Sequence, residues 1–486
     1  SDVCSSDLGE GRLKVLSIQG QSAADFLTAI AENPRYKWIE MRADLAAESI
    51  DLKYIRANFS GKIIFTCRDF NSDFTRVKSL YERAAEAGFD YLDIDHEFYR
   101  NSSSAFQIYL RQTQSKLIIS FHNYLDSRIT LEGLDRLFSI PADLYKVGLH
   151  LSDVWEGFAL METRRNWKKP IVLALMGEAG EWSRICYKFF HNPWTYLCIP
   201  GQQTAPGQVD VLRWEAEFSR VPAQDWDLFG VLGQRIEHSF SPYFHNRLLK
   251  RRKLKATYQR FPVQDIGLFL ELAPAQLKGL SITTPFKRSI LPFLKTHDHL
   301  VEASGSCNTV MREGEDWIGW NTDASGLRLA LDSIMPGWVE KEKIVILGAG
   351  GMARSALAAL CDQNSKIYLW NRTEHKALML AEKFGVKTLR SESPIDLENT
   401  LLIQATSAGF GQPEVSPIPF HWLKPTTTLV ESIYNPRYTC LVQEAMHQGI
   451  EVLQAVDMFL HQALEQQRIW FGEKAFSLKE ARKVLS

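Results

Sequence analysis

The sequence predicts an α/β protein in which an N-terminal (β/α)8 barrel precedes an α/β domain and a Rossmann domain. Three observations support this fold class. The chain has 486 residues, which is long enough for two or three domains. Short apolar runs recur eight times within the first 200 residues, and a glycine-rich turn joins an apolar run to a helical segment near residue 350.

The eight apolar runs begin at residues 15, 38, 63, 91, 117, 144, 171 and 195. The segments between them have helical periodicity, as in residues 23–32 and 75–88, and Gly88 is typical of a helix C-terminus. Even spacing and continuously apolar strands favour a closed barrel over residues 13–220, with an open doubly wound sheet as the alternative. Residues 1–12 lack the basic and apolar parts of a signal peptide and are expected to form a tail.

The composition excludes several classes of partner. Lys and Arg number 56 against 57 Asp and Glu, so no overall field favours nucleic acid, and the basic run at 250–253 has no interleaved aromatic residues. No apolar run approaches the ~20 residues needed to cross a bilayer. The seven cysteines are scattered without a C-x-x-C, which argues against disulfides and zinc. We therefore expect a cytoplasmic protein that binds no nucleic acid, membrane or metal.

Polar residues gather where the predicted barrel strands end, which is the active face of such barrels. His122 ends one strand, and Lys146 lies within the next. Adjacent strands are ~4.8 Å apart, so both side chains can point into one mouth. The other charged residues around this rim are Glu40, Arg42, Arg68, Asp93, Asp95 and Arg184. Three arginines at one mouth indicate a substrate that bears a carboxylate, because guanidinium groups match carboxylate geometry.

A lysine inside an apolar strand is costly to bury as an ammonium. We expect burial and the nearby arginines to lower the pKa of Lys146 towards that of a neutral amine. A neutral amine can attack a ketone, and His122 would then transfer the protons. The alternative is that Lys146 and His122 only form ion pairs at the end of the barrel.

These segments together resemble type I 3-dehydroquinate dehydratase over residues 13–212. They are EMRAD (40–44), FTCR (65–68), SFHN (120–123), Lys146, MGEAGEWSR (176–184) and TAPGQ (204–208). The resemblance implies a covalent imine between Lys146 and the C3 ketone of 3-dehydroquinate, with His122 moving protons during the loss of water. It also implies that Arg184 binds the substrate carboxylate and that Glu40, Arg42 and Arg68 contact the side that bears the hydroxyl groups. Thr204 and Gln208 would form a lid over the site.

The chain departs from this family at one position. The family usually has a glutamate four residues after the arginine that Arg68 matches, and this chain has Ser72 there. Asp69 or Asp73 is then the candidate carboxylate that orients His122. The departure also motivates a different hypothesis, in which the barrel is an inactive structural or docking module.

The glycine-rich turn lies in residues 343–360, which are typical of a strand, a turn and a helix. The spacing G-x-G-x-x-[GA] lets a pyrophosphate approach the helix N-terminus, although a bare tight turn is the alternative. The next strand ends without the acidic residue that binds the NAD ribose, which favours NADP because arginine and threonine can receive a 2′-phosphate. Thr373 is also a candidate cap for the helix that begins at Glu374. The predicted cofactor residues are Gly348, Ala349, Gly350, Gly351, Met352, Asn371, Arg372 and Thr373.

Hydroxyl and amide side chains end several short strands before this turn. Single serines, threonines and asparagines at strand ends are more often turn formers than ligands. Here they come with a lysine and an aspartate, which makes a site for a polyol plausible. The residues are Ser239, Ser241, Thr283, Lys287, Asn308 and Asp323.

These stretches, with ESIYNP (431–436) and AVDMFLHQALEQ (455–466), resemble shikimate dehydrogenase over about residues 226–486. The resemblance implies a substrate-binding domain of residues 226–335 and 455–486 and an NADP-binding Rossmann domain of residues 338–454. Lys287 and Asp323 would be the catalytic pair. Ser239 and Ser241 would bind the substrate carboxylate. The hydroxyl groups and the ring of the substrate would contact Thr283, Asn308, Tyr434 and Gln462.

The two implied activities are consecutive. The first half would dehydrate 3-dehydroquinate to 3-dehydroshikimate, and the second half would reduce that product to shikimate with NADPH. The retained hydroxyls of Ser239, Ser241 and Thr283 favour shikimate over quinate, and an NAD-dependent quinate dehydrogenase is the alternative. The fused arrangement resembles the bifunctional dehydratase–dehydrogenase family.

Overall fold

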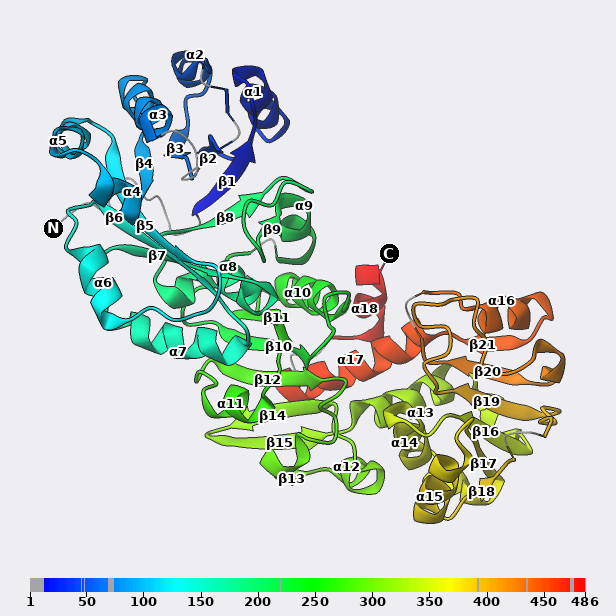
Figure 1. Ribbon diagram of the computed structural model, residues 1–486. Helices are drawn as coiled ribbons and strands as arrows, with labels where there is room; N and C mark the ends of the chain where they lie inside the picture. Colours follow the sequence, from blue (N-terminus) through cyan, green and yellow to red (C-terminus); the bar gives the residue numbers. More distant parts are fainter. Residues whose placement is uncertain are drawn as a thin grey trace. The chain divides into compact units, whose positions relative to one another are not determined.

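The computed structural model describes residues 13–44, 46–47, 49–68, 74–218, 220–390, 393–433, 436–472 and 476–485 (Figure 1). The chain divides into two compact units. The first consists of residues 1–228 and 234–276, and the second of residues 229–233 and 277–486. The finer division into three domains stays a prediction.

The first unit begins with a curled sheet of parallel strands. Its order is β7-β6-β5-β4-β3-β2-β1-β8-β9, and β7 and β8 contact each other as the curl closes. The strands are β1 (Leu13–Gln19), β2 (Trp38–Arg42), β3 (Lys62–Thr66), β4 (Tyr91–Asp95), β5 (Lys116–Asn123), β6 (Leu144–His150), β7 (Ile171–Met176), β8 (Trp194–Cys198) and β9 (Val209–Asp210). The first eight coincide with the eight apolar runs, so the predicted (β/α)8 barrel is confirmed.

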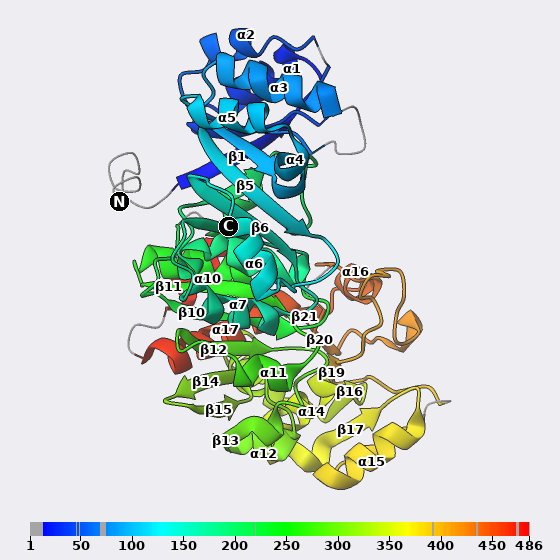
Figure 2. The same cartoon turned by 60° about the vertical axis from the view of Figure 1, so that its left-hand side comes forward.

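Helices cover the outside of this sheet, as Figure 2 shows for α1, α2, α3 and α5. Ser22 caps α1 by accepting a hydrogen bond from the Asp25 N–H, and Gly88 follows α3 with φ +77° as the sequence predicts. The helices are α1 (Ala23–Glu32), α2 (Leu52–Ala57), α3 (Phe74–Glu86), α4 (His96–Asn101), α5 (Ser104–Gln112), α6 (Leu131–Phe138), α7 (Val154–Arg164), η2 (Glu178–Gly180), α8 (Glu181–Ile185), η3 (Tyr187–Phe190), α9 (Val211–Arg213) and the π-helical turn η4 (Trp214–Phe218).

The interior of the barrel is filled by side chains from its own strands. Trp38 and Trp194 pack at 5.5 Å between ring centroids, within a cluster that includes Val15, Ile64 and Ile118. The rest of the first unit is α10 (Ser241–Arg251), β11 (Ala256–Pro262) and α11 (Ile266–Glu271). These elements pack against the barrel: the ring of Phe158 on α7 lies 5.1 Å from that of Phe269 on α11.

The second unit contains most of a six-stranded mixed sheet of order β11-β10-β12-β14-β15-β13, namely the strands from β10 onwards, together with its helices. In this sheet β14 runs antiparallel to β12 and β15, and β13 runs parallel to β15. The elements are β10 (Asp227–Gly233), β12 (Leu277–Ile282), η5 (Leu291–Phe293), β13 (Leu294–His297), α12 (His299–Ser304), β14 (Thr309–Glu313), β15 (Asp316–Trp320), α13 (Thr322–Ile334), α17 (Ala455–Phe471) and α18 (Leu478–Leu485).

The second unit also contains an all-parallel sheet of order β18-β17-β16-β19-β20-β21, the 3-2-1-4-5-6 order of a Rossmann fold. Both faces are buried: Ile344 and Ile346 pack against α13, α14 and α15, whereas Val345 and Leu347 pack against α16. The elements are η6 (Pro336–Glu340), β16 (Lys343–Leu347), α14 (Gly351–Ala359), η7 (Cys361–Lys366), β17 (Ile367–Trp370), α15 (Glu374–Phe384), β18 (Lys387–Thr388), β19 (Thr400–Gln404), η8 (Phe420–Trp422), β20 (Thr428–Glu431), α16 (Cys440–His447) and β21 (Glu451–Leu453). The predicted Rossmann fold is confirmed.

None of the described helices has the length and apolar character required to cross a bilayer.

Candidate active sites

Lys146 lies inside the barrel between two buried carboxylates. Its Nζ is 2.9 Å from Glu40 Oε1 and 2.9 Å from Asp93 Oδ2, and it lies 4.2 Å from the ring centroid of Tyr196. Lys146, Glu40 and Asp93 are 6%, 2% and 1% exposed. The cluster is thus shielded from water, where ionic interactions are strong.

The pKa of Lys146 follows from these contacts. Burial lowers it, but the charges of Asp93 and Glu40 together outweigh burial and raise the pKa above its ordinary value. Burial likewise opposes the ionisation of Glu40, yet Lys146 and Arg42 hold the Glu40 pKa at about 2. The predicted lowering of the Lys146 pKa is therefore wrong for this state of the enzyme, because the prediction weighed burial and arginines but not two carboxylates in direct contact.

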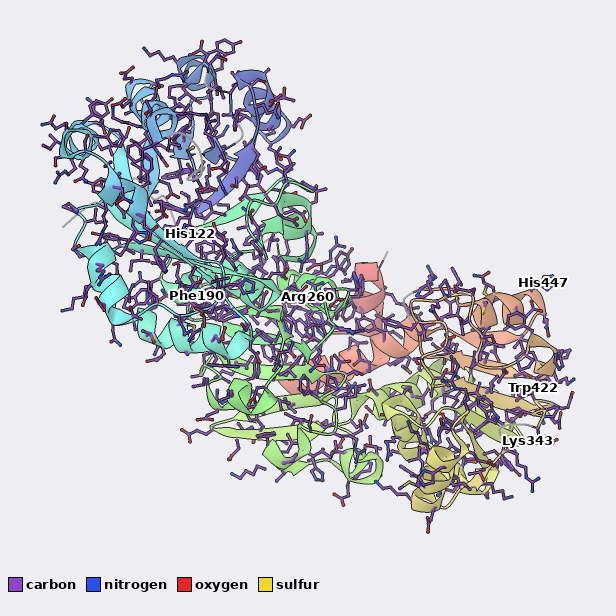
Figure 3. All side chains as sticks on the ribbon, viewed as in Figure 1. His122, Phe190, Arg260, Lys343, Trp422 and His447 are labelled. Carbon is purple, nitrogen blue, oxygen red and sulfur yellow. The ribbon has the colours of Figure 1, made fainter. Side chains whose placement is uncertain are left out.

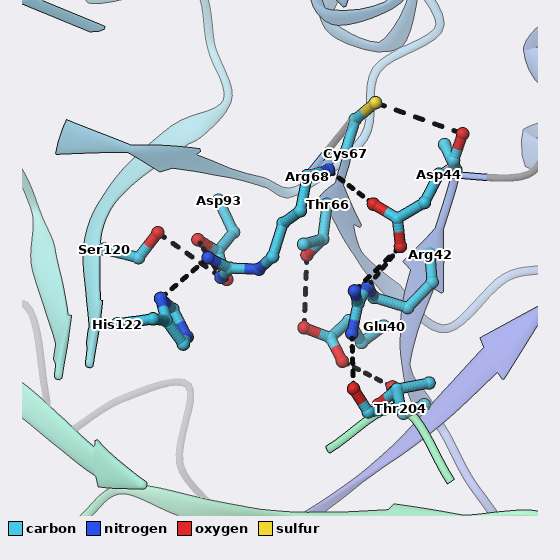
Figure 4. A network of polar contacts seen from close by, with 12 residues as sticks. Glu40, Arg42, Asp44, Thr66, Cys67, Arg68, Asp93, Ser120, His122 and Thr204 are labelled. Carbon is cyan, nitrogen blue, oxygen red and sulfur yellow. Dashed lines mark hydrogen bonds and ion pairs between the residues drawn. The ribbon is translucent and has the colours of Figure 1, made fainter. Parts of the chain in front are cut away.

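His122 lies on the same face of the sheet as Lys146. Its imidazole contacts Arg68 (Figure 4). In the ladder between β5 and β6, Ser120 is opposite Lys146 and His122 is opposite Gly148, where a Cβ would lie 2.5 Å from the imidazole. Arg68 Nη1 lies 2.7 Å from His122 Nδ1. A guanidinium can only donate, so Nδ1 accepts and the ring proton is on Nε2.

His122 is held in its neutral form. Burial, followed by the charges of Arg68 and Lys146, lowers the His122 pKa well below its ordinary value. Arg68 in turn donates from Nη2 to both oxygens of Asp93 at 3.2 Å. Arg68 is therefore the described residue that orients the imidazole. Asp69, Asp73 and Ser72, which entered the prediction of a carboxylate partner, lie outside the described residues.

Among the described residues no carboxylate forms a direct ion pair with the buried guanidinium of Arg184. Its Nη2 donates to the Pro206 carbonyl at 3.3 Å, and among the described residues no group accepts from its Nε. Burial lowers the Arg184 pKa to about 10. A desolvated guanidinium of this kind is a ready site for an anion, and a carboxylate can take both of its donors.

One pocket brings together the predicted catalytic and substrate-contact residues of the barrel, whereas Asp93 and Asp95, also predicted at this rim, are not among its lining residues. Thr204 and Gln208 close one side, with Thr204 Oγ1 donating to Gln208 Oε1 at 3.0 Å, and Arg42 pairs with Asp44 at 2.8 Å. The pocket is lined by Glu40, Arg42, Arg68, His122, Tyr124, Lys146, Ala174, Met176, Arg184, Tyr196, Thr204, Ala205 and Gln208. Sequence reasoning gave no role to Tyr124, Tyr196 or the Ser17 that hydrogen bonds to Glu40. It placed Asp93 on the rim without a role, although a carboxylate in an apolar strand is the same signal that marked Lys146.

The predicted pair of the second unit is in contact. Lys287 Nζ lies 2.5 Å from Asp323 Oδ2, and Asp323 lies in the first turn of α13, which the Asn321 side chain caps. A Cβ built on Gly351 would lie 3.8 Å from Lys287 Cδ. The pair therefore lies beside the glycine-rich turn, where a bound dinucleotide would meet a substrate.

The glycine-rich turn has the geometry that a dinucleotide requires. Gly348 has φ +114°, and a Cβ there would lie 2.8 Å from the Ala405 carbonyl oxygen. A Cβ on Gly350 would meet open space, and no side chain caps the N-terminus of α14, which begins with Gly351 and Met352. Space and uncapped N–H groups at a helix N-terminus fit a pyrophosphate. Ala349 packs against the apolar cluster behind this turn.

The residues after β17 follow the strand next to the glycine-rich turn. Leu347 pairs with Trp370, so the ends of β16 and β17 are neighbours. The side chains of Arg372 and Thr373 are exposed, and Asn371 Nδ2 donates to the Thr373 carbonyl at 2.8 Å. Thr373 occupies the N-cap position of α15 as predicted, but its hydroxyl makes no capping hydrogen bond. Its side chain is thus available to a 2′-phosphate.

The other residues predicted to bind the second substrate belong to several elements of the two units. Asn308 is buried with its Oδ1 accepting from the Thr322 N–H at 2.7 Å, so part of its amide is occupied. Gln462 donates to the Phe459 carbonyl on α17, and Thr283 follows β12. Ser239 and Ser241 belong to the first unit at the start of α10, and Tyr434 lies outside the described residues.

Known protein families match both halves of the chain. A family model described as type I 3-dehydroquinase matches residues 15–214. Models described as shikimate dehydrogenase substrate binding domain and as shikimate / quinate 5-dehydrogenase match residues 231–310 and 330–408.

Similar proteins include single-activity and fused examples. A bifunctional 3-dehydroquinate dehydratase/shikimate dehydrogenase, chloroplastic, from Arabidopsis thaliana is 28% identical over 466 residues, covering 87% of this chain and 75% of that protein. A shikimate dehydrogenase (NADP(+)) from Aquifex aeolicus is 32% identical over 257 residues, covering 52% of this chain and 94% of that protein. A solved structure of dehydroquinate dehydratase and shikimate dehydrogenase from S. pombe has 22% identity and a TM-score of 0.46, covering 98% of this chain and 99% of that one.

Proposed function

Because the chain belongs to the shikimate dehydrogenase family in its second half and carries a type I 3-dehydroquinase domain in its first, we propose that it converts 3-dehydroquinate to shikimate. It is a bifunctional enzyme of the shikimate pathway that combines a lyase with an NADP-dependent oxidoreductase. One observation carries the first activity. A single pocket holds the buried Lys146, a neutral His122, and Arg184, whose Nε has no acceptor among the described residues.

In the dehydratase pocket Arg184 binds the substrate carboxylate, and the hydroxyls approach Glu40, Arg42 and Arg68. Movement of Arg68 towards a hydroxyl frees His122 Nδ1, and engagement of Glu40 by another hydroxyl weakens its hold on the Lys146 ammonium. Lys146 can then pass a proton to His122 and attack the C3 ketone. His122 returns that proton to the departing oxygen as the imine forms.

The imine makes the adjacent C–H acidic enough for His122 to remove a proton as a general base. The imidazolium then protonates the leaving hydroxyl group, so His122 is neutral again when water departs. Hydrolysis of the protonated imine consumes one water and releases Lys146 as the ammonium, which pairs again with the carboxylates Glu40 and Asp93. Thr204 and Gln208 exclude water from the pocket during these steps.

The proton balance of this pocket gives a testable pH dependence. Replacing Asp93 with Asn removes a negative charge 2.9 Å from Lys146 Nζ, which disfavours the ammonium and lowers the Lys146 pKa. The amine then becomes neutral at lower pH, so the ascending limb of kcat/KM for dehydration is expected to move to lower pH. The pH profile of the dehydratase reaction measures this shift.

Asp95→Asn is the matched control for Asp93→Asn. Asp95 lies on the same strand and accepts from the Glu97 N–H as the N-cap of α4, a role that asparagine also fills. Its profile should match that of the native enzyme. An Asp93→Asn profile that coincides with the control would contradict the assigned charge balance.

In the reductase site Asp323 keeps the Lys287 ammonium oriented through their 2.5 Å contact. Bound NADPH supplies the reducing equivalent for the C3 ketone of 3-dehydroshikimate. Lys287 donates the proton that the carbonyl oxygen needs as its charge develops. Arg372 and Thr373 receive the 2′-phosphate that distinguishes NADP from NAD, and Ser239 and Ser241 bind the substrate carboxylate.

The proposal includes finer statements about organisation and location. We assign residues 13–220 to the dehydratase domain, 226–335 and 455–486 to the substrate-binding domain, and 338–454 to the Rossmann domain. The scattered cysteines, which form no disulfide among the described residues, support a reducing cytoplasm. Ser239, Ser241 and Thr283 support shikimate over quinate.

The test is a rate measurement on the full-length chain with purified substrates. NADPH oxidation that begins on addition of 3-dehydroquinate requires both activities, and 3-dehydroshikimate tests the second alone. Oxidation with 3-dehydroshikimate only would make the barrel an inactive module. Faster reverse rates with quinate and NAD than with shikimate and NADP would support the quinate dehydrogenase alternative.

A further inference from the structure

A chain of ion pairs in the first unit begins at the helix that carries Arg184 and ends at Ser239. Glu181 on α8 accepts two hydrogen bonds from Arg213, each at 2.6 Å. Arg213 Nε also lies 3.4 Å from Glu217 Oε2 in η4. Glu217 is paired with Arg260 on β11, which Figure 3 labels.

Arg260 bridges the Glu217 carboxylate and the backbone carbonyl of Ser239. Its Nη1 and Nη2 donate to the two oxygens of Glu217 at 2.6 Å and 3.1 Å, and Nη2 also donates to the Ser239 carbonyl at 2.7 Å. The side chains of Arg260 and Glu217 are only 8% and 13% exposed. A bidentate pair in this setting fixes the orientation of a guanidinium more firmly than a surface pair does.

The Ser239 turn also has local hydrogen bonds. The Ser239 N–H donates to the Ile236 carbonyl at 2.9 Å, and Ser239 Oγ accepts from the Ser241 N–H at 3.3 Å. No side chain caps α10, which begins at Ser241. The hydrogen bond from Arg260 to the Ser239 carbonyl is thus one of the described contacts that hold the backbone of this turn in place.

We propose that Arg260 is a positioning residue of the reductase and that Glu217 holds it in place. The pair orients the serine turn for the substrate carboxylate, and Arg213 with Glu181 anchors it to the dehydratase barrel. This inference rests on the proposed function, in which Ser239 and Ser241 bind that carboxylate.

Glu217→Gln and Arg260→Gln in the full-length chain test the inference through KM and kcat for shikimate oxidation. Each variant is expected to raise the KM for shikimate by about 10-fold, equivalent to about 1.4 kcal/mol. The kcat should stay within about 2-fold, since Lys287 and Asp323 are untouched, and the KM for NADP should be unchanged. Arg260→Lys keeps the positive charge but loses the planar guanidinium that donates two hydrogen bonds to Glu217. Its KM for shikimate should therefore lie between those of the native enzyme and Arg260→Gln.

Glu215→Gln is the matched control because Glu215 lies in the same π-helical turn. Its ion pair with Arg35 is exposed, with side chains 38% and 66% accessible, and it should leave the KM for shikimate unchanged. A purely structural ion pair would lower the Tm of Glu217→Gln without raising its KM, and this result would overturn the inference. If Arg260→Gln does not fold, Glu217→Gln and Arg260→Lys decide the question.

Ser239→Ala separates failure of the inference from failure of the proposed function. An unchanged KM for shikimate in Ser239→Ala would remove the assigned carboxylate site itself. A raised KM in Ser239→Ala with native values in Glu217→Gln would leave that site intact and refute only the positioning role of Arg260.

Discussion

Replacing Lys146 with arginine is expected to lower the dehydratase kcat by about 10⁴-fold or more while the reductase rates keep their native values. Arginine retains the positive charge that Glu40 and Asp93 hold at 2.9 Å, so the buried carboxylates stay compensated, but it cannot form an imine with a ketone. Steady-state rates with 3-dehydroquinate and with shikimate, measured on one preparation, give both values.

Lys146→Ala completes this test. Alanine removes the nucleophile and also leaves two buried carboxylates without their cation, so we expect a comparable loss of dehydratase activity together with a lower Tm. A Lys146→Arg enzyme that kept more than about a tenth of its dehydratase activity would contradict covalent catalysis through this residue.

Replacing Lys287 with methionine is expected to lower the reductase kcat by about 10²- to 10⁴-fold, because the reaction loses its general acid. Methionine keeps the length of the side chain but has no proton to donate beside Asp323. The dehydratase rate should be native, which also shows that the variant is folded. Initial rates with 3-dehydroshikimate and NADPH measure the loss.

Lys295→Met is the control for Lys287→Met. Lys295 pairs with Asp316 on a neighbouring strand of the same mixed sheet, and its side chain is 62% exposed. Loss of that surface pair should leave both activities within about 2-fold of native values. Equal reductase rates for Lys287→Met and the control would exclude the assigned proton donor.

The fold could be predicted from the sequence because parallel strands that are buried on both faces produce continuous apolar runs. All eight barrel strands and the helix at 23–32 lie where the spacing predicts them. The glycine-rich turn was equally visible, since Gly348 adopts a φ of +114° that side-chain-bearing residues rarely take. Local backbone requirements of this kind leave direct traces in the sequence.

The charge state of the dehydratase pocket could not be predicted in the same way. Lys146 meets Glu40 and Asp93 across 106 and 53 residues of chain, and the balance depends on separations that only the folded strands define. The Arg68 contact with His122 also depends on side-chain direction at the barrel mouth. The sequence therefore predicted which residues share the pocket but gave the wrong direction for the Lys146 pKa.

The link between the barrel and the Ser239 turn left no pattern in the sequence. Glu217 and Arg260 are 43 residues apart, and neither lies in one of the short motifs quoted for the two resemblances. Charged residues in such positions are most often solvated, so only their burial and bidentate geometry distinguish them.

The most direct measurement of the central claim is the mass of the full-length protein and its Lys146 peptide after borohydride treatment with 3-dehydroquinate. The account predicts a stable adduct on Lys146 in the native enzyme and none in Lys146→Arg. An unchanged mass in the native enzyme, or an adduct on another lysine, would contradict the imine on which the dehydratase mechanism depends.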